Sequence, residues 1–125
     1  MMTPTSQHTD PRVLLHALDQ DIDAFISLSN TFLDITPPML DRLQAAVAAS
    51  QPAEIALESH TLKNTLALVG AKALANCLQE IEIRAHQGIA NGYGDLIKNL
   101  PEQIQQVQQE VRDHIRHYTL QGKQS

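Results

Sequence analysis

One stretch of apolar residues at helical spacing constrains the fold more than any other feature of the chain. On a wheel of about 100° per residue, the apolar and small side chains of this stretch gather on one face. A stripe this wide has to pack against other elements, so a helix with one buried face is predicted from about Pro52 to Val69. Gly70 is predicted to end this helix in a tight turn. The stripe consists of Ile55, Ser59, Leu62, Leu66 and Val69.

His60 points away from this stripe, and small residues surround it on the wheel. Ala53, Ala56 and Ala67 leave the ring open to a partner. An exposed imidazole is largely neutral and nucleophilic at pH 7, and Lys63 at i+3 could neutralise an anion held above the ring. The arrangement suits a phosphoryl group carried on a ring nitrogen. Spacing alone does not distinguish this chemistry from an ordinary solvated helix face.

Similar periodicity predicts three further long helices, from about Asp21 to Val47, from Ala71 to about Gln87, and from about Tyr93 to Tyr118. Together with the His60 helix they make four helices with short connections, which favours an all-α, antiparallel up-down four-helix bundle. A short extra N-terminal helix is expected after Asp10-Pro11, an N-cap followed by proline at the first helical position. The apolar residues expected to face inward are Val13, Leu14 and Leu18 in the short helix, Phe25, Ile26, Leu28, Ser29, Phe32 and Leu33 in the second, Leu74, Cys77, Leu78, Ile81 and Ala85 in the fourth, and Leu96, Ile97, Leu100, Ile104, Val107, Val111, Ile115 and Tyr118 in the last.

Prolines leave two boundaries open. Thr36-Pro37-Pro38 is either a helix break or a kink, and a break is the default because proline removes a donor and clashes with the preceding turn. Pro101 either lies early in the last helix or marks a second helix start.

Length and composition favour a single domain over residues 1–125. Its ordered core is expected at residues 10–118, with frayed tails at 1–9 and 121–125. The net charge of −5 and the few aromatic residues argue against nucleic-acid binding. No stretch approaches the ~18 to 20 apolar residues of a membrane span, and no signal peptide is recognisable. The single Cys77 suggests a reducing cytoplasm and is interpreted as a small core residue.

Carboxylate–histidine pairs raise the possibility of an enzyme with a metal in a helical bundle. The pairs Glu82/His86 and Glu110/His114 are four residues apart, and His117 follows three after His114. Helical di-metal bundles use Glu-x-x-His, which this chain lacks, so no metal site is expected and the pairs are interpreted as solvated helix faces. Neither a glycine-rich phosphate loop nor a kinase motif is present, so the chain is not expected to use ATP.

The segment around His60 resembles the signature of histidine-containing phosphotransfer (HPt) domains of bacterial phosphorelays. Ser59 precedes the histidine as a small residue, and the resemblance extends in helix order from about Asp19 to Tyr118. The clear departure is Asn64, where the family has glycine. The matching positions are His60, Leu62, Lys63, Ala67 and Gly70, followed downstream by Leu74, Cys77, Leu78 and Glu80.

This resemblance implies that His60 accepts a phosphoryl group from the aspartyl phosphate of a receiver domain and passes it to another response regulator. It favours the long kinked helix at Thr36-Pro37-Pro38. It also implies that Lys63 offsets charge on the transferring group. Asn64, which departs from the family, adds a side chain beside the ring that could either hinder the partner slightly or donate a hydrogen bond to the phosphoryl group. The receiver is expected to dock on an apolar patch of Ala56, Leu57, Ala67 and Leu68.

The expected partners are response-regulator receiver domains and a hybrid sensor histidine kinase. No cofactor is expected, because Mg²⁺ comes with the receiver. The chain is expected to be a cytoplasmic monomer and a phosphocarrier rather than an enzyme. The sequence leaves open whether it is a free-standing protein or a piece of a hybrid kinase. The alternative is a helical-bundle adaptor that binds a receiver domain or kinase independently of phosphorylation, for which Asn64 is the only hint.

Overall fold

The computed structural model describes residues 7–124, and side chains as far as residue 121. Within that range the chain is helical, and none of its helices is both long and apolar enough to cross a membrane. Residues 1–6 and Ser125, which belong to the tails expected to fray, lie outside it. The helical segments are α1 (Pro11–Ala17), α2 (Ile22–Ala48), α3 (Pro52–Leu68), α4 (Lys72–His86), α5 (Gly94–Ile97) and α6 (Leu100–Gln124).

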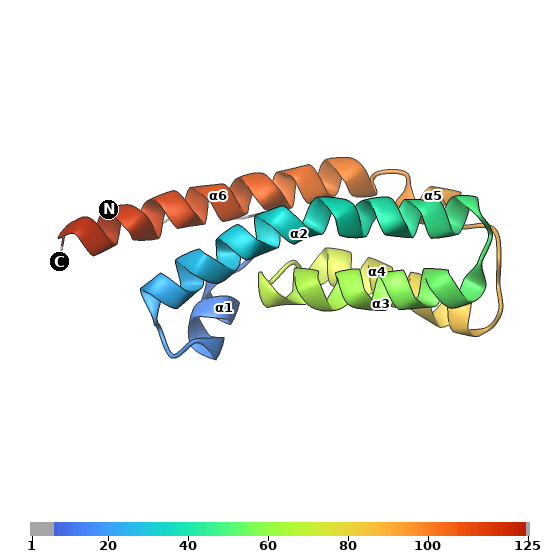
Figure 1. The fold of residues 1–125 in the computed structure, drawn as a ribbon, viewed down its shortest axis with the longest axis horizontal. Coiled ribbons are helices and arrows are strands. Elements are labelled where there is room, and N and C mark those ends of the chain that lie inside the picture. The colour runs from blue at the N-terminus through green and yellow to red at the C-terminus, as the bar shows by residue number, and fades with distance from the viewer. Residues whose placement is uncertain (1–6, 125) are drawn as a thin grey trace.

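The four long helices form a bundle around one apolar core. Helix α2 packs against α3 and α6, and α3 packs most extensively against α4. In Figure 1 the colour gradient reverses from each long helix to the next, so the chain changes direction at every connection. The apolar stripe predicted for α3 is fully buried in this core, together with the inner residues of α4 and α6.

Helix α2 continues through Pro37 and Pro38 rather than breaking there. Both prolines are exposed, so the carbonyls that lose their helical partners lie towards solvent. Figure 1 shows α2 changing direction near its middle. The kinked helix, and not the default break, is therefore the correct interpretation.

The last predicted helix is divided into two segments. Helix α5 ends at Ile97, and α6 begins at Leu100 with Pro101 in its first turn, where a missing N–H is least costly. Pro101 thus marks a second helix start. At its other end α6 runs to Gln124, six residues beyond the end predicted for the helix at Tyr118.

Helix α1 covers one end of the bundle through a small apolar cluster of its own. Leu14 and Leu15 pack with Phe25 of α2, whose ring meets Tyr118 of α6 edge-on at 5.1 Å. Asp10 caps α1 by accepting from the backbone N–H of Arg12. Two inward assignments are wrong, because Val13 of α1 and Leu28 of α2 are exposed.

The segment before α1 is held by a carboxylate of α6. Glu110 accepts hydrogen bonds from the backbone N–H groups of Gln7, His8 and Thr9, and from the Thr9 hydroxyl at 2.6 Å. The neighbouring His114 is buried. The interpretation of Glu110 and His114 as a solvated pair is therefore wrong, because the segment before α1 bonds to Glu110 and His114 is buried.

Gly70 joins α3 to α4 and also contacts the start of the chain. Its φ of +73° is in the left-handed region, and a Cβ there would lie 2.7–2.8 Å from atoms of Asp10. The backbone N–H of Asp10 donates to the carbonyl of Val69 at 3.0 Å. The predicted turn is confirmed, and the close approach adds a second reason for glycine.

Replacing Gly70 with alanine tests that second reason. Gly88 also has a positive φ, +82°, but a Cβ there would meet nothing within 4 Å. We expect Gly70→Ala to lower the free energy of unfolding by about 1–3 kcal/mol more than Gly88→Ala, because only Gly70 adds a steric overlap to the backbone strain. Urea denaturation measures both variants, and equal losses would contradict the close approach.

Burial of His114 makes stability depend on pH. Burial lowers the pKa of His114 and outweighs Glu110 and Asp113, which act to raise it. As pH falls below the unfolded value of about 6.5, the unfolded chain takes up the proton first, so the folded state loses stability. We expect His114→Gln to lose less stability than the wild type between about pH 7.5 and about pH 5.5. The exposed His16→Gln serves as control, and equal losses in all three proteins would contradict the assignment.

Candidate functional site

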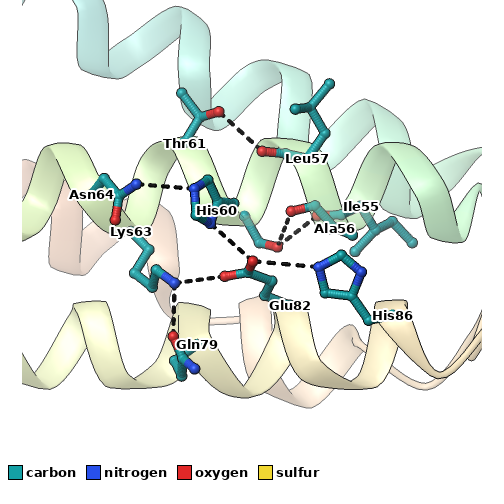
Figure 2. Close-up of polar contacts among 11 residues, drawn as sticks. Ile55, Ala56, Leu57, His60, Thr61, Lys63, Asn64, Gln79, Glu82 and His86 are labelled. Atoms are coloured by element: carbon teal, nitrogen blue, oxygen red, sulfur yellow. Dashed lines mark hydrogen bonds and ion pairs between the residues drawn. The ribbon is translucent and has the colours of Figure 1, made fainter.

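His60 lies in the middle of α3, on the face opposite the core. Its side chain is 52% exposed, whereas the preceding Ser59 is buried and donates to the carbonyl of Ile55 at 2.6 Å. The outward direction predicted for the histidine is therefore confirmed. Figure 2 shows the ring between α3 and α4, with polar partners on two sides.

Glu82 of α4 holds one side of this ring. Its Oε2 lies 2.9 Å from Nδ1 of His60, and its Oε1 accepts from Nζ of Lys63 at 2.7 Å. Lys63 also donates to Oε1 of Gln79 at 2.7 Å (Figure 2). The Glu82 side chain is only 12% exposed, so most of this carboxylate is covered by its neighbours although the ring that it holds is exposed.

The charge state of Glu82 determines which ring nitrogen carries the proton. Burial acts to raise the pKa of Glu82, but hydrogen bonds from Lys63 and His60 outweigh it and lower that pKa below its ordinary value. Glu82 is therefore ionised at neutral pH and only accepts hydrogen bonds. Nδ1 of His60 has to be the donor, so in the neutral ring Nε2 carries the free lone pair.

Asn64 contacts that second nitrogen. Its amide Nδ2 lies 3.1 Å from Nε2 of His60, one helical turn along α3. Because Nε2 is the acceptor, the amide group of Asn64 donates. The residue that departs from the family pattern thus touches the nitrogen that is available for chemistry.

Lys63 differs from its predicted placement. The sequence predicts that it reaches the space above the ring, but its side chain is only 19% exposed and its ammonium is bonded between Glu82 and Gln79. The close packing of α3 and α4 explains this, because it covers the lysine stem and brings the Glu82 carboxylate within reach. Lys63 therefore contacts the ring through Glu82.

A shallow hollow of about 350 Å³ lies beside the ring. His86 stands at its edge with Nε2 3.4 Å from Oε2 of Glu82. The i,i+4 pair predicted from the sequence thus exists, but the predicted solvation of Glu82 is wrong, because its side chain is only 12% exposed. The hollow is lined by Ala53, Ala56, Leu57, His60, Glu82 and His86.

The predicted docking patch is partly exposed. Leu57 is 61% exposed, and Ala67 and Leu68 are exposed as well. Ala56 is only 5% exposed because it packs into the core, so its placement on the outward face is wrong. Leu68 also borders an apolar hollow of about 120 Å³ between α1, α2 and α3. Its lining residues are Leu14, Leu28, Thr31, Phe32, Ile35, Thr65, Leu68 and Val69.

Sequence reasoning missed Glu82 and Gln79 as partners of the His60 helix. The periodicity of α4 shows only that both lie off its apolar stripe. Which off-stripe residue meets His60 depends on the register between α3 and α4, and no pattern within one helix reports that register. The only signal in the sequence was that α4 carries a carboxylate, Glu82, outside its apolar stripe.

Comparison with known proteins places the chain in a family. The Hpt domain model matches residues 27–110, more than half of the chain and including the whole His60 network. The chain therefore belongs to the Hpt domain family, whose members act in histidine phosphotransfer. No curated protein matches its sequence.

The fold also matches a solved structure. Histidine-containing phosphotransfer protein B (HptB) from Pseudomonas aeruginosa PAO1 superimposes with a TM-score of 0.61 at 23% sequence identity. The match covers 97% of this chain and 99% of that one. At this identity the likeness establishes the helical-bundle fold, and the family match supports a role in a phosphorelay.

Glu82→Gln tests whether Glu82 sets the ring tautomer. Lys63 should continue to donate to an oxygen at position 82, here the amide oxygen. The NH₂ group of the same amide would then face Nδ1 of His60. We expect the neutral ring to move its proton to Nε2, as seen in ¹⁵N NMR spectra of the imidazole. Glu80→Gln, on the exposed face of α4, is the matched control. An unchanged tautomer in Glu82→Gln would contradict the assignment.

Proposed function

We propose that His60 accepts a phosphoryl group from the aspartyl phosphate of a receiver domain and passes it to another response regulator. The observation that carries this proposal is an exposed imidazole whose Nδ1 is held by an ionised carboxylate. Its other nitrogen, Nε2, retains a lone pair, which faces the amide of Asn64. Membership of the Hpt family supports the same assignment.

In the proposed step, Nε2 attacks phosphorus in line. Its lone pair forms the N–P bond while the bond from phosphorus to the aspartyl oxygen breaks, and that oxygen leaves with the electron pair as a carboxylate. Nδ1 keeps its proton, so the ring becomes positive. Glu82 stabilises this charge from 2.9 Å. Transfer to the second receiver is the same step in reverse.

Lys63 supports this step mainly through Glu82. Its ammonium keeps the carboxylate ionised and holds it beside Nδ1. We therefore propose that Lys63 has two effects. It orients the ring through Glu82, and its positive charge stabilises the transferring group, as expected from the resemblance. Mg²⁺ is assigned to the receiver, and the protein acts as a phosphocarrier without ATP chemistry of its own.

We propose that the receiver docks along the α2–α3 side of His60. Leu57 and Leu68 flank the ring along α3, and Leu28 and Ile35 of α2 add exposed apolar surface next to Leu68. Exposed apolar side chains that lie on the same side of α3 as a reactive residue are typical of an interaction surface. Ala67 completes the patch on α3, while the buried Ala56 is excluded from it.

The finer expectations belong to the same proposal. They are an antiparallel up-down four-helix arrangement with α1 as the extra helix, a monomer, a cytoplasmic location, and a hybrid sensor histidine kinase upstream. The alternating chain direction in Figure 1 supports the first of these.

A transfer assay tests the proposed function. Purified protein is mixed with receiver domains charged by a small phosphodonor and examined for acid-labile, alkali-stable phosphate. We expect label on the wild type and on the His16→Gln control, and none on His60→Gln. Lys63→Ala should be labelled about tenfold more slowly, because Glu82 loses the cation that holds it. A tenfold lower rate corresponds to an activation free energy about 1.4 kcal/mol higher.

Circular dichroism spectra and melting curves establish that each variant is folded. Equal labelling of His60→Gln would overturn His60 as the acceptor. A folded wild type that takes no label from any receiver, yet binds one, would favour the phosphorylation-independent adaptor instead.

A further inference from the structure

The Asn64 amide occupies the nitrogen that has to attack. It lies 3.1 Å from Nε2 of His60, and Glu82 on the other side fixes Nδ1 as the protonated nitrogen. We propose that Asn64 caps the attacking nitrogen in the unphosphorylated protein and moves its hydrogen bond to the phosphoryl group once His60 is loaded. This inference rests on the function proposed above and assigns a second residue that acts on the reacting atoms.

The direction of the hydrogen bonds requires Asn64 to be a donor. Lys63 and His60 both donate to the ionised Glu82, so the ring has only one lone pair left, at Nε2. An amide oxygen facing this lone pair would be repelled, whereas an amide N–H is attracted. The Lys63–Glu82–His60–Asn64 chain therefore has one consistent set of proton positions at neutral pH.

This contact slows loading. Phosphorus has to approach along the Nε2 lone pair, which is the direction that the Asn64 N–H occupies, so the hydrogen bond breaks before attack. Asn64 is exposed, and among residues 7–121 its side chain makes no other hydrogen bond. Its amide group is free to rotate aside when a phosphodonor arrives.

The same amide stabilises the loaded state. A phosphoryl group on Nε2 places three anionic oxygens next to a donor that was 3.1 Å from the nitrogen itself. Hydrogen bonds to charged acceptors are stronger than neutral ones. The hydrogen bond from Asn64 to the phosphoryl group is therefore stronger than the one that Asn64 loses at Nε2. Glycine, the family's residue at this position, has no side chain to supply either contact.

Asn64→Ala and Asn64→Asp test the cap, with Asn30→Ala as the matched control. Asn30 also bonds a residue four earlier in its helix, the carbonyl of Ile26, and lies in the N-terminal half of α2. Loading is measured with phosphoramidate alone, which charges the ring without a receiver and releases ammonia. Lifetime is measured as the loss of phosphohistidine from the isolated, loaded protein.

Removing the donor should affect the two rates in the same direction. We expect Asn64→Ala to load about two- to tenfold faster and to lose its phosphate about two- to tenfold faster, the range for one hydrogen bond. Asn64→Asp should load more slowly than the wild type, because an acceptor next to Nε2 favours a proton there and repels the phosphoryl oxygens. Asn30→Ala should match the wild type in both rates.

NMR of the unphosphorylated protein separates this inference from the proposed function. Loss of the Asn64 hydrogen bond should move the ¹⁵N resonance of Nε2 in Asn64→Ala to higher frequency while the proton stays on Nδ1. Suppose that the wild type is labelled, and that Asn64→Ala has the same loading rate, the same phosphate lifetime and the same Nε2 resonance as the wild type. This result would overturn the cap and leave the phosphocarrier role standing. A shifted Nε2 resonance in a protein whose His60 takes no phosphate from any donor would overturn the proposed function and, with it, the role of Asn64 on the phosphoryl group.

Discussion

The Glu82 carboxylate is the interaction on which the candidate site depends. One oxygen accepts from Lys63 and the other from His60, so a single side chain of α4 orients two residues of α3. Most of the carboxylate is covered by its neighbours, yet the paired lysine keeps it charged. A buried charge is costly without a partner, and here the partner is also part of the site. The exposed imidazole is therefore held in one orientation and one tautomer, although it projects from a helix surface.

The connection between α3 and α4 makes this pairing possible. Gly70 reverses the chain within a few residues, and the left-handed backbone there allows the two helices to pack along their length. Asp10 closes against the same turn, which connects the N-terminal segment and α1 to the end of α3. One glycine thus contributes to both the register of the site and the closure of the bundle end.

Much of the fold was predictable because helix formation and burial are local properties of the pattern. The stripe from Ile55 to Val69 is buried as predicted. Asp10 and Asp21 cap helix starts with their side chains, and Gly70 lies after a helix end, where its backbone adopts a positive φ. The misassignments share one cause. Val13 and Leu28 are exposed, and His114 is buried, because neighbouring segments decide what covers a residue at the edge of a stripe.

The sequence by itself determined that the chain is helical, that His60 faces outward from an apolar stripe, and that its surroundings resemble an HPt signature. Periodicity within each helix carries the first two of these, and the resemblance rests on the identities of the residues around His60. Only the tertiary structure decided that Lys63 is bonded to Glu82, that Ala56 is buried, and that Asn64 and Glu82 divide the two ring nitrogens between them. Those facts depend on the register between helices, which is set by packing over their whole length and leaves no local trace in the sequence.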